Sequence, residues 1–497
     1  MARKKLPYYV QELKRVESDT VESYENLTEV PRIMLAGIDT YDYVIEIAIG
    51  LLSIWREQNL DVVPFSVGPS FENLETFRAA SANKVYTLDS FYQEESEMAY
   101  LLSHYVEGHD LALLIASENY YDSKLPYSAS WAMEESSPLG SPADLAYKTN
   151  TPVVMVIDLS DLSYSSMAKV EGILEFKADQ QIAGFIVTGV KADKAEYAKE
   201  LLESEFGIPV FASFPSRLTD DKAPSLYSVI PEIAQENWRK NIESITSDLY
   251  KYMDLHRLLK LAMRATDLEQ DFPDSLFKAQ KLIGFNRNRF NLAVARDEAF
   301  NAYYQENLDI LEEMGANIVY FSPMKDPILP KAVDGIYLGT GNLIKHLAEV
   351  SKNESLRIQI RRLAMQGMPI LAEGTGAVYL ADAYRNRTGV EWPLAGVLPS
   401  IVSSNYDTKY EYYCKMTSRR DDLLCKNNFS LRCLLGNEFI FEPNGASYRA
   451  LIKGIGHQME AFSTNTIWAS QATLHFYASP IAVARFALRC LGENSTI

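Results

Sequence analysis

Residues 32–67 read RIMLAGIDTYDYVIEIAIGLLSIWREQNLDVVPFSV, which is an apolar run, an amphipathic segment and a second apolar run. The first run, RIMLAGI, is short and almost wholly apolar, as is typical of a strand buried inside a sheet. The segment YDYVIEIAIGLLSIWREQ repeats apolar residues at helical spacing, and DVVPFSV is again typical of a strand. A strand, a helix and a strand in this order predict a parallel βαβ unit and therefore an α/β domain.

The alternation of strand and helix continues along the chain. Further apolar runs predict buried strands at residues 111–117, 151–159 and 182–190. A second series predicts strands at residues 290–297, 317–323, 335–341 and 368–380. Between the two series, residues 236–265 contain no Gly or Pro and predict continuous helix. We therefore expect two doubly wound α/β domains, with an N-terminal extension (1–31), a first domain (32–230), a helical bridge (231–285) and a second domain (286–497).

The composition favours a protein with two ordinary cores. The chain has 497 residues, of which 47% are hydrophobic and 23% are charged. Its 66 acidic and 48 basic residues give a net charge of -18, which disfavours nucleic acid and anionic membranes as partners. No apolar run is long enough to span a bilayer, and the basic N-terminus lacks the apolar stretch of a secretory signal. We therefore expect a cytoplasmic protein.

The cysteines do not indicate a metal site or a disulfide framework. Their spacing matches no zinc pattern, and they are few for the length: Cys414, Cys425, Cys433 and Cys490. We expect buried thiols and no bound metal.

The junction of the first strand and helix is where an α/β domain carries a nucleotide-binding loop. Such a loop needs glycines, so that backbone N–H groups converge on phosphate, a lysine for charge and a hydroxyl for magnesium. The junction and the later segments VVPFSVGPSFEN, TLDSF, GSPADLA and PVVMVID resemble the amidoligase domain of the cobyrinate a,c-diamide synthase family. The family's loop is similar to AGTSSGVGKTT. Aligned from Gly37, its two later glycines, its lysine and its threonine correspond to Tyr41, Tyr43, Val44 and Ile45.

The resemblance implies a P-loop NTPase-like sheet of the dethiobiotin synthetase type, with the groups that hold a triphosphate removed. We therefore expect no cofactor, and ATP with magnesium only if the site has been rebuilt. The alternative is a misaligned, divergent loop. The order of the flanking segments argues against it.

The second domain carries the more specific resemblance. NLAVARDEAFNAYYQEN, starting at residue 291, is similar to the start of the family's class I glutamine amidotransferase domain, which is flavodoxin-like. Where the family reads AECGGLMYL, residues 372–380 read AEGTGAVYL. The family's cysteine attacks the side-chain amide of glutamine from a sharp strand-to-helix turn and is activated by a histidine. Its position is Gly374 here, and glycine cannot form a thioester. Thr375 would need a base of its own.

Other parts of the glutaminase centre are partly retained. WASQATLHFYASP (468–480) resembles the family's ASYLHLHFASNP, with His475 at the second histidine and Thr473 at the first. Which of these two histidines is the family's base stays open. GNEFIF (436–441) resembles GHEFHYS, and the oxyanion loop GGG becomes GTG. The retained neighbours of the lost nucleophile are thus Glu373, His475, Glu438, Gly339 and Gly341.

The ARDEAFN motif also suggests ligand contacts. In the family, this stretch helps to shape the cleft where carboxylates of a corrin-type substrate are amidated. The resemblance makes the best ligand candidates Asp297, Glu298, Phe300, Tyr303 and Tyr304. The alternative interpretation is that the three aromatic residues pack in a domain-interface core.

These losses predict a non-catalytic protein. Phosphoryl transfer requires charge compensation, and glutamine hydrolysis requires a nucleophile. We expect a pseudoenzyme that binds a tetrapyrrole or corrinoid precursor, or a partner subunit for an active paralogue or another protein. One alternative is an active carbon–nitrogen ligase that amidates tetrapyrrole carboxylates with free ammonia and a rebuilt nucleotide site. Another is unrelated chemistry in the old cleft.

Overall fold

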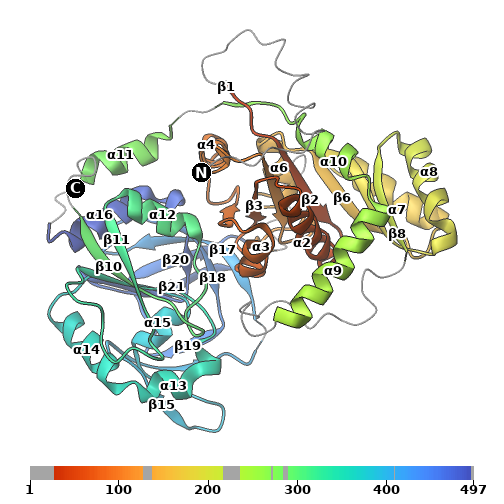
Figure 1. Ribbon diagram of the computed structural model, residues 1–497. Coiled ribbons are helices and arrows are strands. Elements are labelled where there is room, and N and C mark those ends of the chain that lie inside the picture. Colours follow the sequence, from red (N-terminus) through yellow and green to blue (C-terminus); the bar gives the residue numbers. More distant parts are fainter. Residues whose placement is uncertain are drawn as a thin grey trace. The chain divides into compact units, whose positions relative to one another are not determined.

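The computed structural model describes residues 27–126, 137–215, 235–269, 272–283, 289–407 and 409–493 (Figure 1). The chain divides into two compact units. One unit comprises residues 1–123 and 130–272, and the other comprises residues 124–129 and 273–497. Of the N-terminal extension, residues 1–26 lie outside the described residues. Strand β1 (Leu27–Thr28) pairs antiparallel with β9 (Leu268–Glu269).

The first unit is built on a seven-stranded sheet in the order β4-β3-β5-β2-β6-β7-β8, in which all pairings are parallel. Its strands are β2 (Arg32–Gly37), β3 (Val62–Val67), β4 (Tyr86–Leu88), β5 (Leu111–Ala116), β6 (Val153–Asp158), β7 (Ile182–Val190) and β8 (Val210–Pro215). Because β2 lies between β5 and β6, its carboxyl end is at the switch point where α/β sheets bind ligands. The α/β fold predicted from the sequence is therefore confirmed.

The helices of the first unit are α2 (Tyr41–Glu57), α3 (Leu74–Ser81), α4 (Glu95–Val106), α6 (Pro142–Lys148), α7 (Tyr164–Glu175), η1 (Ala192–Lys194), α8 (Ala195–Phe206), α9 (Gln235–Tyr252) and α10 (Leu255–Ala262). Helix α2 packs into the core together with α9. A Cβ at Gly50 would lie 2.3 Å from Leu249 Cδ1 and 2.6 Å from Ile245 Cγ2. The segment expected as a bridge therefore contributes to this core. Its predicted continuous helix is wrong, because Asp254 accepts the Arg257 N–H (2.9 Å) and starts α10 as a new helix.

The second unit contains a six-stranded sheet in the order β11-β10-β12-β13-β23-β22, parallel except for β22. Its strands are β10 (Phe290–Ala295), β11 (Ala316–Phe321), β12 (Gly335–Leu338), β13 (Ile370–Glu373), β22 (Phe462–Ser463) and β23 (Ile467–Ser470). Its helices are α11 (Asp274–Ile283), α12 (Gln305–Glu313), η3 (Leu343–His346), α13 (Leu347–Lys352), α14 (Glu354–Met365), α15 (Thr375–Leu380), η4 (Phe476–Ala478) and α16 (Pro480–Cys490).

Two further sheets follow α15, and the sequence analysis did not predict them. One has the order β15-β14-β16-β19, with β14 (Ala381–Arg385), β15 (Glu391–Pro393), β16 (Leu398–Ser404) and β19 (Phe439–Glu442). The other is antiparallel, in the order β21-β20-β17-β18-β24, with β17 (Glu411–Ser418), β18 (Ser430–Gly436), β20 (Tyr448–Ile452), β21 (Gly456–Glu460) and β24 (Thr473–Leu474). Residues alternate between buried and exposed along β20, which is typical of a sheet with one face in solvent.

Among the described helices, none is long and apolar enough to cross a bilayer. All four cysteines are buried, free thiols. In the described part of the chain, no group of three or more His, Cys, Asp or Glu side chains is arranged to hold a metal ion.

Candidate functional site

The position that corresponds to the amidotransferase nucleophile lies in a sharp turn between β13 and α15. Gly374 has φ +53° and ψ -123°, a conformation that costs a residue with a side chain about 1–3 kcal/mol. Its N–H donates to the Ser470 carbonyl oxygen (2.9 Å), which fixes the turn against the neighbouring strand. The strand-to-helix elbow of a nucleophile is thus present without the nucleophile's side chain.

The space beside this elbow is filled by Thr340. A Cβ at Gly374 would lie 2.5 Å from Thr340 Oγ1 and 2.6 Å from Thr340 Cβ, too close for either atom to stay in place. Thr340 Oγ1 also accepts the Thr375 N–H (3.3 Å). In elbows of this kind, the N–H of the residue after the nucleophile stabilises the oxyanion. Thr340 therefore occupies the space that a side chain at position 374 would enter, and it accepts the N–H of the following residue.

The glycines on either side of Thr340 are required by packing. A Cβ at Gly339 would lie 2.4 Å from Tyr303 Cε1, and one at Gly341 would lie 2.4 Å from the Ala299 carbonyl oxygen. The Gly339 N–H donates to Tyr303 Oη (2.9 Å). Both glycines are thus explained by the close approach of residues 299–303, without reference to a ligand.

His475 is buried and held by helix α12. Its Nε2 lies 2.8 Å from Glu306 Oε1, and neither side chain is exposed. Asn307 holds the backbone on both sides of the histidine, because Nδ2 donates to the Leu474 oxygen (2.8 Å) and Oδ1 accepts the Phe476 N–H (2.7 Å). The sequence analysis missed Glu306 and Asn307. Both residues lie at the end of the quoted segment NLAVARDEAFNAYYQEN, and this position was the feature of the sequence that could have identified them.

Glu373 also holds the backbone next to His475. Its Oε1 accepts the Leu474 N–H (2.9 Å), and its Oε2 accepts the Tyr337 hydroxyl (2.7 Å). Burial raises the pKa of Glu373 to about 7, against the two hydrogen bonds, which lower it. The contacts that Glu373 makes are structural.

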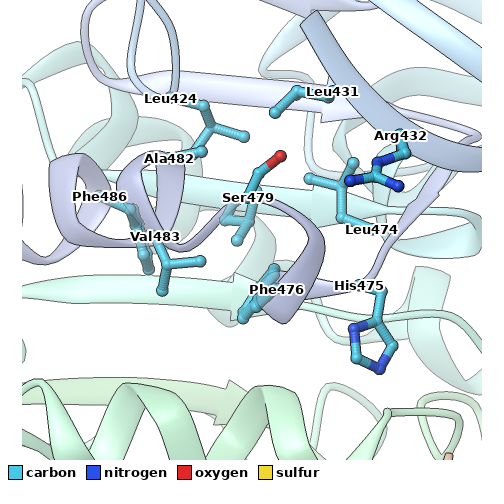
Figure 2. A pocket seen from close by; sticks show the side chains of 11 residues that line it. Leu424, Leu431, Arg432, Leu474, His475, Phe476, Ser479, Ala482, Val483 and Phe486 are labelled. Atoms are coloured by element: carbon cyan, nitrogen blue, oxygen red, sulfur yellow. The ribbon is translucent and has the colours of Figure 1, made fainter. Parts of the chain in front are cut away.

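A small cavity lies beside His475 (Figure 2). Its polar side chains come from Arg432, Ser479 and His475, and the imidazole is directed away from Ser479. Its other walls are apolar: Leu371, Leu424, Leu431, Leu474, Phe476, Ala482, Val483 and Phe486. The cavity volume of about 10 Å³ is roughly the room of one water molecule and is far too small for glutamine. Glu438, the remaining predicted neighbour, is exposed and lies 3.2 Å from Lys409 Nζ.

In the first unit, the positions that correspond to phosphate-binding groups lie inside α2. This helix begins at Tyr41, so only residues 38–40 connect it to β2. Val44 and Ile45 are 1% and 5% exposed and belong to the hydrophobic core. Tyr41 and Tyr43 are partly buried and pack against the same core. The four aligned positions are therefore helical, and their side chains belong to the core or pack against it.

The N-terminus of α2 also carries its own negative charge. Asp39 precedes the helix and lies 3.8 Å from Lys169 Nζ, and Asp42 lies in its first turn. The Asp39 N–H donates to Asn119 Oδ1 (2.9 Å), so this amide is already satisfied. A Cβ at Gly37 would lie 2.0 Å from Thr40 Oγ1, which itself donates to the Val156 oxygen (2.9 Å). A helix N-terminus favours an anion, and here carboxylates of the chain already lie at that end.

Comparison with known proteins identifies the family of the chain. The CobB/CobQ-like glutamine amidotransferase domain family matches residues 291–422. The cobyrinate a,c-diamide synthase of Methanosarcina acetivorans is 30% identical over 467 residues, which cover 88% of this chain and 90% of that protein. This chain belongs to the cobyrinate a,c-diamide synthase family. The synthase of Caldanaerobacter subterraneus is 26% identical over 464 residues (92% and 98% of the two chains), and that of Methanosarcina barkeri is 27% identical over 481 residues (91% and 94%).

Two motifs that this member of the cobyrinate a,c-diamide synthase family retains hold each other in the first unit. Ser90, from TLDSF, donates to Asp144 Oδ2 (2.5 Å), from GSPADLA. The Gly140 N–H donates to Ser90 Oγ (3.0 Å), and Lys148 Nζ lies 2.9 Å from Asp144 Oδ2. These side chains are therefore engaged with one another.

The acidic ligand candidates of this family member already have partners. Asp297 Oδ1 accepts the Ala299 N–H (2.9 Å), and Oδ2 accepts the Ser322 hydroxyl (2.7 Å). Glu298 lies 3.0 Å from Lys325 Nζ on the surface. Asp297 thus organises its own loop, and Glu298 is the more accessible of the two carboxylates.

The aromatic candidates pack inside the second unit. Phe300 is fully buried and meets Tyr379 edge to face. Tyr303 donates to the Ala295 oxygen (2.5 Å), and the ring of Tyr304 lies 5.3 Å from that of His475. Their contacts support the loop of Gly339 and the segment of His475.

Proposed function

We propose that this member of the family is a non-catalytic protein. It binds a tetrapyrrole or a corrinoid precursor in the cytoplasm, or serves as a subunit for an active paralogue or another protein. The observation that carries the proposal is the turn at Gly374, where Thr340 fills the space that a nucleophilic side chain would need. Thioester formation needs a thiolate at this turn, and neither the thiol nor the space for it is present.

The first unit supports the same proposal. Transfer of a phosphoryl group needs cationic groups around the transferred oxygens. The corresponding positions are Val44 and Ile45 in the core, and the helix end carries Asp42 and Asp39, of which Asp39 is paired with Lys169 (3.8 Å). This arrangement opposes binding of a triphosphate.

A second candidate function is ATP-dependent amidation of tetrapyrrole carboxylates with free ammonia. The observation that favours it is the match to cobyrinate a,c-diamide synthases over about nine-tenths of the chain, for example 92% with the Caldanaerobacter subterraneus protein. In this alternative the chain is a carbon–nitrogen ligase, and a rebuilt site holds ATP and magnesium. Ammonia from solution replaces the glutaminase step, so Gly374 would not prevent the reaction.

Calorimetry and spectroscopy separate these functions. For the non-catalytic protein, we expect no heat on titration with Mg-ATP, no glutaminase activity and a saturable shift of the Soret band with cobyrinate. For the ligase, Mg-ATP binds at micromolar concentration, and mass spectrometry detects amidated cobyrinate when ammonium is supplied. Glutaminase activity above the background of a heat-denatured sample would contradict the assignment of Gly374. If the Soret band does not shift, the proposal is reduced to its second form, in which the protein is a partner subunit. Co-purification with an active paralogue tests that form.

A further inference from the structure

A larger cavity lies elsewhere in the second unit. It is bounded by η3 and α13 on one side and by the β14–β15 hairpin on the other, and α13 and β15 are neighbours in the fold (Figure 1). Its volume is about 450 Å³, within the range of roughly 300–1,000 Å³ that is typical of small-molecule sites. We call it the hairpin pocket. Its residues do not include Gly374, Thr340 or His475.

The charge of the hairpin pocket is positive. Lys345 and Arg387 line it, and no carboxylate does. In the described part of the chain, neither cation forms an ion pair. The Arg387 guanidinium lies 5.4 Å from the ring centroid of Tyr406, another lining residue. Two lining cations with no lining carboxylate contrast with the chain's net charge of -18. They favour a ligand that carries negative charge.

The wall of the hairpin pocket is aromatic and fixed. Tyr384 and Trp392 are direct partners across β14 and β15. Tyr384 is 2% exposed and its hydroxyl lies 2.7 Å from Ser404 Oγ, while Trp392 packs against the core. Because the two rings are held by a paired sheet and a core, their positions are set before a ligand arrives.

The hairpin turn that carries Arg387 is also held in place. Asn386 Oδ1 accepts the Thr388 N–H (3.0 Å), the Thr388 hydroxyl (2.8 Å) and the Val390 N–H (2.9 Å). These three bonds set the turn on which Arg387 stands. Asn386 and Thr388 themselves line the pocket, so the same bonds order two of its polar groups.

We propose that the hairpin pocket binds a planar aromatic ligand with two negative charges, as a phosphate or as paired carboxylates. The ring lies against Trp392, beside the buried Tyr384, and the charged group lies between Lys345 and Arg387. This site goes beyond the proposed function. It is separate from both altered centres, and it does not require the tetrapyrrole to bind.

Calorimetric titration of the full chain with 1-naphthyl phosphate tests the proposal, with inorganic phosphate and 1-naphthol as partial probes. We expect 1-naphthyl phosphate to bind at least about tenfold more tightly than either partial probe, because only it meets both the rings and the cations. Benzene-1,2-dicarboxylate tests the carboxylate form, and tighter binding of either dianion than of inorganic phosphate and 1-naphthol supports the site.

Variants locate the binding. Lys345→Gln and Arg387→Gln should each weaken binding of the tighter dianion by about tenfold, since each removes one charged contact. Lys352→Gln is the matched control, because Lys352 is an exposed lysine on α13 that does not line the pocket. Equal losses in the control variant would overturn the proposal. So would the absence of binding by both dianions, or binding no tighter than that of phosphate alone.

Discussion

The occupation of the nucleophile's volume by Thr340 predicts a specific coupling between two substitutions. We consider Gly374→Cys, which restores the family's thiol, and Thr340→Gly, which restores the family's loop. The single cysteine variant has to place a Cβ 2.5 Å from Thr340 Oγ1 and 2.6 Å from Thr340 Cβ. The double variant has no such contact, because glycine at position 340 lacks both atoms.

The magnitude follows from two separate costs. A side chain at φ +53° costs about 1–3 kcal/mol whatever its neighbours are. Overpacking against Thr340 adds about 1–3 kcal/mol. Gly374→Cys alone should therefore lower the free energy of unfolding by about 2–6 kcal/mol. Thr340→Gly removes only the second cost, so a double-mutant cycle should give a favourable coupling of about 1–3 kcal/mol between positions 374 and 340.

Urea denaturation of the four proteins of the cycle measures this coupling. Gly374→Ala is the matched control, because it adds the Cβ without the thiol and should show similar coupling. Mass spectrometry after treatment with the glutamine analogue 6-diazo-5-oxonorleucine then tests the chemistry, and labelling of Cys at position 374 should require Thr340→Gly. Additive free energies within about 0.5 kcal/mol would refute the steric argument.

Three further predictions concern the framework around the two centres. The pKa of Glu373 is raised to about 7, so its contribution to stability is present below about pH 4 and is lost as the pH rises towards 7; Glu373→Gln should raise the melting temperature more at pH 8 than at pH 5, and a shift independent of pH would contradict this. His475→Leu removes the 2.8 Å hydrogen-bond partner of Glu306 Oε1 and should lower the free energy of unfolding by about 1–3 kcal/mol in urea, whereas an unchanged free energy would show that the pair is dispensable. Gly50→Val places a Cβ 2.3 Å from Leu249 and should destabilise the first unit by about 1–3 kcal/mol, detectable as a lower melting temperature; an unchanged value would mean that α9 does not pack there.

The parallel sheets could be predicted from the sequence because their strands are buried on both faces. Strands such as β2 and β5 are buried at every position, so they stand out as continuous apolar runs. The antiparallel sheets of the second unit gave no such signal. Strand β20 alternates between buried and exposed residues over a short length, and β18 pairs with β24, which lies far along the chain. Pairing over such a separation depends on the tertiary fold, which a local pattern does not encode.

The candidate site was predicted in part for a similar reason. The correspondence of Val44 to the family's lysine and of Gly374 to its cysteine comes from a linear comparison of motifs and stays a prediction. The position of Thr340 against Gly374 is a contact between two loops and requires the fold. The roles of Glu306 and Asn307 were missed because both residues belong to a motif that was interpreted as a ligand-binding segment.

The two changes at the glutaminase centre are best understood together. Protein interiors are densely packed, so loss of a buried side chain leaves a cavity that destabilises the fold. Thr340 fills the volume beside Gly374. Its hydroxyl oxygen accepts the Thr375 N–H, which would otherwise be available to donate to an oxyanion. The elbow therefore remains stable without a thiol. The glycines on either side of Thr340 persist because Tyr303 and the backbone of Ala299 approach them closely. The two glycines beside Thr340 are thus accounted for by packing alone.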